Sequence, residues 1–187
     1  MGYKTITKNL DVTHYLQADS RWKDKVLSSK IDDVLYSSTI GKIGCAMTSG
    51  AMVANITPGT LWDKHKMTDY LCDWTKIPTH TFTTHSISST ASLNTKLFSE
   101  IVLNDNPVIV YGDDGTGSIY STHFAVVYGF SGTVAVDSEG GYSLANYDLP
   151  QFKVFDPSTV SGYGNHVDVF SFNDRFPVKS LRLTDPK

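Results

Sequence analysis

Cys45 is the residue of this sequence best placed to act as a nucleophile. It stands in the stretch "GKIGCAMTSGAMV" (41–53), directly after Gly44 and before a run of small and apolar residues that Pro58-Gly59 stops. This composition predicts a buried helix that begins near the cysteine. Unpaired N–H groups at a helix N-terminus stabilise a thiolate. A cysteine in this position is nevertheless more often a packing residue, so a chemical role requires a base.

His123 is the candidate base. It is the first residue of the strand-like run "HFAVVYGF" and follows the Gly/Asp-rich loop "GDDGTGS". A histidine at the start of a strand is anchored by the strand and can still face a groove. The other histidines of the chain lie in polar surroundings. We therefore predict that His123 takes the proton of the Cys45 thiol.

A third group must orient the imidazole, and two acids compete for this role. Asp156 lies in "VFDPS" and Asp137 in "VAVDSEGG". A hairpin turn within "EGG" (139–141) would place Asp156 opposite His123 in an antiparallel pair. A turn at 131–132 would carry Asp137 past the histidine. The pattern favours Asp156 and keeps Asp137 as the alternative.

An attack on a carbonyl also needs a donor for the developing oxyanion. Gln17, in "YLQADSRW", lies upstream of the cysteine and has a suitable side-chain amide. The alternative is an exposed loop glutamine, and residue type alone does not decide between them.

The elements expected in the first half of the chain are helices. We expect a helix over 46–54, a second from Thr60 to about Trp74, and a third from an N-cap at Ser92 to a stop before Pro107. The Ser/Thr-rich stretch 79–92 is typical of an extended or looping segment.

Strands are expected from Pro107 onward. The β-branched and aromatic runs are "PVIVYG", "HFAVVYGF", "TVAVDS", "FKVFDP", "VDVFSF" and "KSLRLT". Helices followed by an antiparallel sheet indicate an α+β fold. The length fits a single domain over 1–187, with a helical half of about 15–106, a sheet half of about 107–184 and a groove between them.

Composition excludes several classes of function. A net charge of −3 provides no basic surface for nucleic acid. No apolar stretch approaches the length of about 18 residues that suggests a membrane span, and no signal peptide is recognisable, so we expect synthesis in the cytoplasm. Oligomeric state and protein partners stay open.

The two cysteines, Cys45 and Cys72, match neither a disulfide framework nor a zinc motif. Cys72 is expected to pack in the core. His80 and His85 have no familiar metal-ligand spacing. We expect no metal and no cofactor.

Five segments stand in a characteristic order along the chain: "YLQADSRW" (15–22), "TIGKIGCAMTSGAMV" (39–53), "NPVIVYG" (106–112), "HFAVVYGF" (123–130) and "VFDPS" (154–158). Together they resemble the papain-like cysteine peptidases of the branch typified by bacteriocin-leader-processing, or double-glycine, peptidases and their stand-alone relatives. The resemblance covers most of the chain. It implies a papain-like fold with Cys45 as nucleophile, His123 as general base, Asp156 as orienting residue and Gln17 in the oxyanion hole.

Two departures from this family pattern bear on function. The segment 131–151 is longer than the family's hairpin, which keeps Asp137 under consideration. There is also no transporter-like membrane portion, so processing of a leader during export is not implied.

The resemblance leads to a cysteine endopeptidase, a hydrolase of peptide or isopeptide bonds, as the first hypothesis. Stand-alone relatives include wall-lytic and phage-associated peptidases, which makes a peptidoglycan cross-bridge or a protein precursor a candidate substrate, reached by delivery as a lysin or in a virion. The alternatives are a non-catalytic peptide-binding protein of the same fold, and an acyl transferase or deamidase that uses the same three residues.

Overall fold

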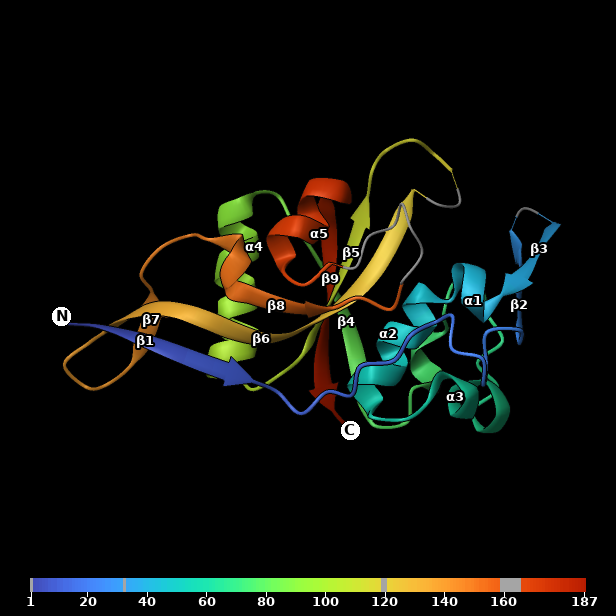
Figure 1. Cartoon of the computed structure of the whole chain (residues 1–187), viewed down its shortest axis with the longest axis horizontal. Helices are drawn as coiled ribbons and strands as arrows, with labels where there is room; N and C mark the ends of the chain where they lie inside the picture. Colours follow the sequence, from blue (N-terminus) through green and yellow to red (C-terminus); the bar gives the residue numbers. More distant parts are fainter. Residues whose placement is uncertain (1, 32, 119–120, 159–165) are drawn as a thin grey trace.

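A large antiparallel sheet organises the molecule (Figure 1). The computed structural model describes residues 2–31, 33–118, 121–158 and 166–187. Within these ranges the sheet has seven strands: β1 (Gly2–Asn9), β4 (His80–Ser86), β5 (Val108–Asp113), β6 (Thr122–Val136), β7 (Tyr142–Leu144), β8 (Phe152–Phe155) and β9 (Val178–Pro186). The expectation of a mixed α+β protein with a large antiparallel sheet is confirmed.

Strand β6 is the centre of this sheet, because it pairs with four other strands. Strands β5 and β8 both pair with Val126 and Val127, so they lie on opposite edges of β6. Farther along, β1 and β7 both pair with 134–136 and again take opposite edges. On the far side of β5 the order continues through β9 to β4.

The turn considered at 131–132 is absent from the structure, and "HFAVVYGF" and "TVAVDS" form one continuous strand. The N-terminal strand β1 explains the difference, because Ile6 and Thr7 pair with Gly132 and Ser131. The Thr7 and Ser131 hydroxyls also lie 3.0 Å apart. Pairing with a segment more than a hundred residues away therefore holds this part of β6 extended.

Helix α2 (Cys45–Ala54) follows the one-turn helix α1 (Ile40–Ile43) and begins at the cysteine, as the pattern predicts. Every residue after Cys45 in the helix is buried. Small residues permit this close packing. A Cβ on Gly50 would collide with the Cδ1 atom of Ile77. Asn55 ends the helix in the left-handed conformation, with a φ of 51°.

The second predicted helix is much shorter than expected. Helix α3 (Pro58–Lys64) begins at an N-cap, where the Thr57 hydroxyl accepts a hydrogen bond from the Thr60 N–H, and it ends ten residues before the expected end at about 74. The chain then turns at Lys66 and Cys72, which have φ values of 54° and 62°. A loop over 65–73 therefore replaces the helix, and a short 3-10 helix, η1 (Trp74–Lys76), follows it.

The structure also differs from two further expectations, one about an N-cap and one about a strand. Helix α4 (Thr90–Phe98) is capped by Ser89 rather than by Ser92, and Ser92 supplies the reciprocal bond of the capping box. It continues into the π-helical turn η2 (Ser99–Leu103). The run "VDVFSF" is a helix, α5 (Val169–Arg175), because Asp168 caps its N-terminus by accepting from Ser171 N–H at 2.8 Å.

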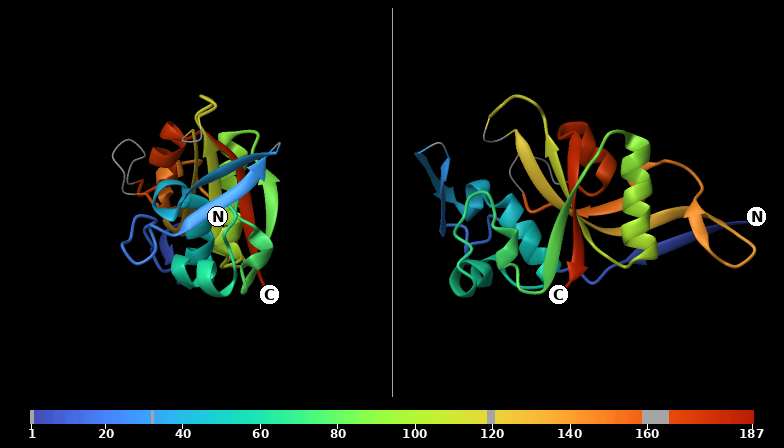
Figure 2. Two further views of the ribbon diagram at one scale, coloured as in Figure 1. Left: turned by 90° about the vertical axis from the view of Figure 1, so that its right-hand side faces the viewer. Right: turned by 180° about the vertical axis from the view of Figure 1, so that it is seen from behind.

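The sheet is covered on both faces. Residues of α4 and α5 share one cluster with Val108, Val110, Ala125 and Val127, which alternate along β5 and β6. Met52 and Val53 of α2 pack with Ile109 and Val126 from the other face. Figure 2 shows α4 crossing the sheet on the side away from the viewer of Figure 1. The period-2 alternation of the strands thus assigns each helix to its face.

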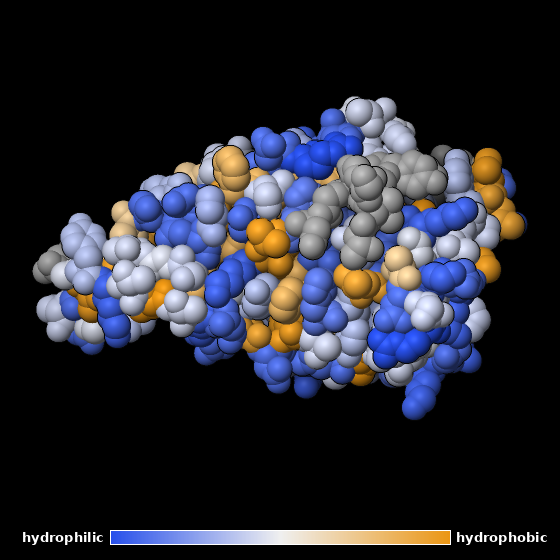
Figure 3. Space-filling view, in the orientation of Figure 1, coloured by the Kyte–Doolittle hydropathy of each residue, from blue (hydrophilic) through white to orange (hydrophobic). Residues whose placement is uncertain are grey.

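The main sheet takes strands from both the first and the second half of the chain. Strands β1 and β4 come from the first half of the chain and join the main sheet, while α5 comes from the second. A separate hairpin of β2 (Val26–Ile31) and β3 (Val34–Thr39) extends beyond α1. Figure 3 shows apolar surface at this end of the molecule, where Val34 and Leu35 are exposed.

We predict that Gly112→Ala destabilises the fold. A Cβ at this position would collide with the carbonyl oxygen of Phe176 and lie 2.7 Å from the Phe176 Cβ. Backbone must then move where β5 meets β9, at a cost of about 1–3 kcal/mol in the free energy of unfolding. Urea denaturation measures this change. Gly2→Ala is the matched control, because a Cβ there would meet no atom of the described residues within 4 Å, its chain neighbours aside. Equal stability of the two variants would contradict the prediction.

Candidate functional site

Cys45 occupies the first position of α2 and lines a cleft. The turn before it is tight: Gly44 N–H donates to the Ile40 carbonyl at 2.8 Å, and a Cβ on Gly44 would lie 2.7 Å from the Ile40 Cγ2. A glycine is therefore required sterically directly before the cysteine. The thiol is partly exposed, whereas Cys72 is buried and burial raises the pKa of its thiol. Cys72 is a core residue, as expected.

His123 lies near the start of β6 and is only 2% exposed. Its ring stacks on Phe172 of α5 and also contacts Phe176, with ring centroids 5.8 and 5.2 Å apart. The Nε2–H group donates to Oδ1 of Asp156 at 2.7 Å. His123 also hydrogen-bonds with the Cys45 side chain, and Nδ1 is the ring nitrogen left for that contact. The three side chains form a chain of contacts: thiol, imidazole and carboxylate.

Asp156 follows the last residue of β8 and is 1% exposed. Besides His123, its Oδ1 accepts from Ser158 N–H at 2.8 Å, and its Oδ2 accepts from His166 N–H at 3.3 Å. His14 donates to its main-chain carbonyl at 2.7 Å. This set of donors holds the carboxylate in one orientation toward the histidine.

The pairing that brings Asp156 to His123 differs slightly from the one expected. Strand β8 pairs Phe155 with Val126, so the register is offset by two residues from a direct Asp156–His123 pair. An offset of two keeps both side chains on the same face of the sheet. The contact is therefore diagonal across the two strands.

Asp137, the alternative acid, lies away from the histidine. It is exposed in the turn between β6 and β7, where its Oδ1 accepts from the N–H groups of Glu139 and Gly141. The structure thus brings Asp156 to His123 and leaves Asp137 as the cap of its own turn.

Gln17 lines the same cleft as Cys45, and two hydrogen bonds hold it there. Its backbone N–H donates to the Pro157 carbonyl at 2.8 Å, and its Nε2 donates to the Gly41 carbonyl at 3.1 Å. The residue is 5% exposed, so the interpretation as an exposed loop glutamine is wrong. One N–H of the amide is used by Gly41, and no acceptor for the second is seen among the described residues.

The electrostatics of His123 reflect two opposing effects. Burial lowers its pKa, because a charged ring is poorly solvated in the interior. Hydrogen bonds and charges of Asp156 and Cys45 act in the opposite direction and outweigh burial, so the pKa of His123 is raised from 6.5 to about 9. With both partners in place, His123 carries two protons at neutral pH.

The cleft around these residues has a volume of about 510 Å³. Its lining includes residues of the main sheet and residues outside it: Thr122, Phe124, Tyr111 and Arg182 from the sheet, and Gln17, Ser158 and the residues 41–43 from other segments. Tyr70 and Leu71 complete it.

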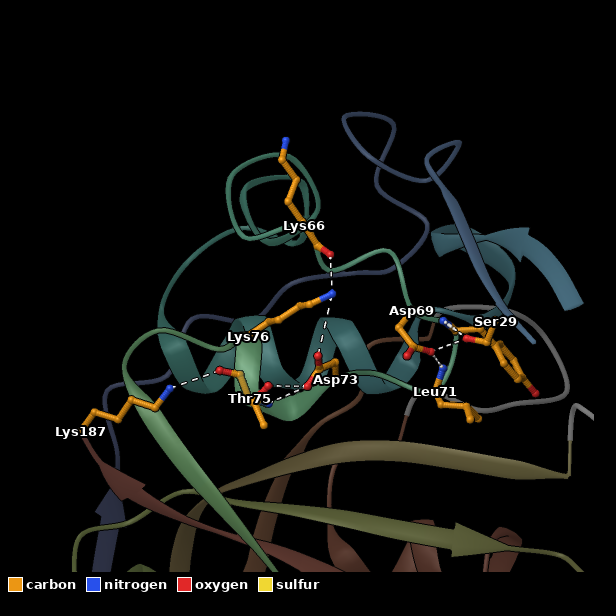
Figure 4. A network of polar contacts seen from close by, with 9 residues as sticks. Ser29, Lys66, Asp69, Leu71, Asp73, Thr75, Lys76 and Lys187 are labelled. Carbon is orange, nitrogen blue, oxygen red and sulfur yellow. Dashed lines mark hydrogen bonds and ion pairs between the residues drawn. The ribbon is translucent and has the colours of Figure 1, made fainter. Parts of the chain in front are cut away.

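Tyr70 and Leu71 belong to the loop 65–73 that replaces the predicted helix. Figure 4 shows the polar contacts that hold this loop. Asp69 accepts hydrogen bonds from the Ser29 hydroxyl and from Leu71 N–H. Lys76 donates to the Lys66 carbonyl at 3.0 Å. A helix through this region would have removed one wall of the cleft.

Sequence reasoning missed His14, His166 and Arg182. His14 and His166 were grouped with polar surface histidines, although both contact Asp156. No local signal identifies them, because the contacts join segments distant in sequence. Arg182 has a weak signal: in "KSLRLT" it alternates with Ser180 and Thr184 on one face of the strand, but the pattern does not reveal what covers that face.

Comparison of the chain with protein-family models, with curated proteins and with solved structures gave no significant match. No group of three or more His, Cys, Asp or Glu side chains able to hold a metal ion occurs in the part of the chain that the structure describes. The function is therefore inferred from the geometry of the cleft.

We predict that the His123 ring titrates near pH 9 and that Asp156→Asn lowers this midpoint, because the raising partner is lost. Since the folded pKa exceeds the usual 6.5, the stabilisation from the charged ring is complete below pH 6.5 and is lost as the pH rises through 9. Histidine ring resonances followed by NMR measure the midpoint. Asp137→Asn is the matched control and should leave it unchanged; a wild-type midpoint at or below 6.5 would contradict the prediction.

Proposed function

We propose that this protein is a papain-like cysteine peptidase in which Cys45 is the nucleophile, His123 the general base and Asp156 the orienting residue. The observation that supports it is the continuous chain of contacts from the Cys45 side chain through the His123 ring to the buried Asp156 carboxylate. Cys45 and His123 line a cleft that is large enough for a peptide segment. Packing alone does not require a buried histidine and carboxylate beside a partly exposed thiol.

In the proposed reaction, Nδ1 of His123 takes the proton from the Cys45 thiol before the substrate binds, which leaves a thiolate beside the doubly protonated ring. The thiolate attacks the carbonyl carbon of the substrate, a C–S bond forms, and the carbonyl electron pair moves onto oxygen. The second amide proton of Gln17 and the backbone N–H of Cys45 stabilise this oxyanion. The intermediate collapses with cleavage of the C–N bond, and the imidazolium gives its proton to the leaving amine.

Hydrolysis of the acyl-enzyme completes the cycle. His123 takes a proton from water, the hydroxide oxygen bonds to the acyl carbon, and the C–S bond breaks with release of the acid, which restores the thiolate and the doubly protonated ring. Asp156 stabilises the imidazolium in both halves of the reaction. The proposed substrate is a peptide or isopeptide bond, with a peptidoglycan cross-bridge as the first candidate; the cellular location stays a prediction from the sequence.

We predict that Cys45 is alkylated rapidly by a low dose of iodoacetamide near neutral pH, while Cys72 is not. His123→Ala should slow the labelling markedly, and Asp156→Ala should slow it less, because the first removes the proton acceptor and the second only its support. Intact-mass spectrometry with peptide mapping gives the rates. Cys45→Ala is the control for labelling elsewhere. If Cys45 is alkylated as slowly as Cys72 in the folded wild type, the proposal is contradicted.

We predict that Gln17→Ala separates labelling from hydrolysis. Alkylation forms no oxyanion, so the rate of Cys45 labelling should change little. Hydrolysis should fall by about 10²–10³-fold, as expected when one oxyanion donor is removed. Release of new amines from purified peptidoglycan and from peptide libraries measures hydrolysis. Equal loss in both assays would assign Gln17 a structural role instead.

A further inference from the structure

Arg182 is a cation that lines the cleft, and none of the ion pairs formed among the described residues includes it. It lies on β9, paired with Ile109 of β5, and shares a face of the sheet with Tyr111. Its Nη1 donates to the Ser180 hydroxyl at 3.1 Å, and its guanidinium lies over the Trp74 ring at 5.8 Å. Ser180 and Trp74 thus contact the guanidinium, and Arg182 lines the cleft together with Tyr111.

No carboxylate neutralises this guanidinium among the residues that the structure describes. Ion pairs there involve other lysines, arginines and histidines. Partial burial lowers the pKa of the Arg182 guanidinium. The electrostatic interactions with Tyr111 and Cys72 act in the opposite direction and are smaller. A guanidinium taken partly out of water without a counter-charge is costly. An anion that binds beside it would remove this cost.

Two cations outside the Cys45–His123–Asp156 group line the cleft. Its described lining contains Lys42 and Arg182 and no aspartate or glutamate, while the charge of His123 is balanced by Asp156 and Cys45. The chain carries a net charge of −3, so this local excess of positive charge is opposite to that of the whole protein. Asp69 and Asp73, which lie near the loop wall, are engaged with Ser29, Leu71, Thr75 and Lys76.

We infer that Arg182 binds a carboxylate of the substrate next to the scissile bond, so that the protein selects acidic peptides. The inference rests on the proposed peptidase function and names its substrate class. A guanidinium presents two parallel N–H groups that match a carboxylate. The carboxylate comes either from an Asp or Glu side chain or from a free C-terminus, and both sources offer the same two oxygens to Arg182.

The test is an NMR titration of the ¹⁵N-labelled Cys45→Ala protein, which binds without turnover. The probes are acetyl-Ala-Glu-Ala-amide against acetyl-Ala-Gln-Ala-amide, and acetyl-Ala-Ala-Ala with a free C-terminal carboxylate against its amide. The acidic member of a pair should bind about tenfold more tightly, as expected for a charge-assisted hydrogen bond. It should also shift the Arg182 Nε–H resonance. Arg182→Gln in the same background should abolish the preference.

Lys42→Gln is the matched control, because Lys42 also lines the cleft but is exposed; it should keep most of the preference. Arg182→Lys keeps the charge without the paired donors and should retain a reduced preference, which guards against a folding defect in Arg182→Gln. A preference for the Glu peptide assigns the side chain as the source, and one for the free C-terminus assigns the terminus. Equal binding of acid and amide, or a preference that survives Arg182→Gln, overturns the inference. The alkylation assay tests the proposed peptidase function separately, because an unreactive Cys45 would contradict that function whatever the peptide-binding result.

Discussion

The buried contact between His123 and Asp156 is the interaction on which the site depends. Taking an imidazole and a carboxylate out of water is unfavourable unless each is hydrogen-bonded. Asp156 meets this requirement through His123 and the N–H groups of Ser158 and His166. The aromatic rings of α5 exclude water from the other side of His123. One ring nitrogen is thereby fixed on Asp156, and the other faces the thiol.

This contact needs elements from all parts of the chain. His123 lies on strand β6. Asp156 follows strand β8, which pairs with β6 on the edge opposite to β5. The segment after β1 passes the end of α2, where the Asn55 side chain binds the Asp11 carbonyl and the Thr13 N–H at 2.9 Å. It then reaches Pro157, which accepts from Gln17. Gln17 is thus positioned by the same loop that contains Asp156.

Glycines and small residues make the close approaches that this arrangement requires. Gly44 is the single residue between α1 and α2, where a side chain would collide with Ile40. The glycine thus permits the tight turn that places Cys45 at the cleft. Gly112, paired with His123 across β5 and β6, leaves room for the backbone of Phe176. Where side chains are large, as in Tyr70, Tyr111 and Phe124, they line the cleft instead.

The sequence by itself determined the features that depend on local pattern: a helix starting at Cys45, strands around His123 and before Asp156, and the preference for Asp156 over Asp137. It was wrong about the helix over 60–74 and the strand "VDVFSF", and it separated into two runs the segment that forms the continuous strand β6. In each case a capping residue or a distant partner overrode local propensity, such as Asp168 for α5 and β1 for β6. Only the tertiary structure decided which polar side chains surround Asp156 and that Arg182 faces the cleft, because those contacts join strands and loops far apart in the chain.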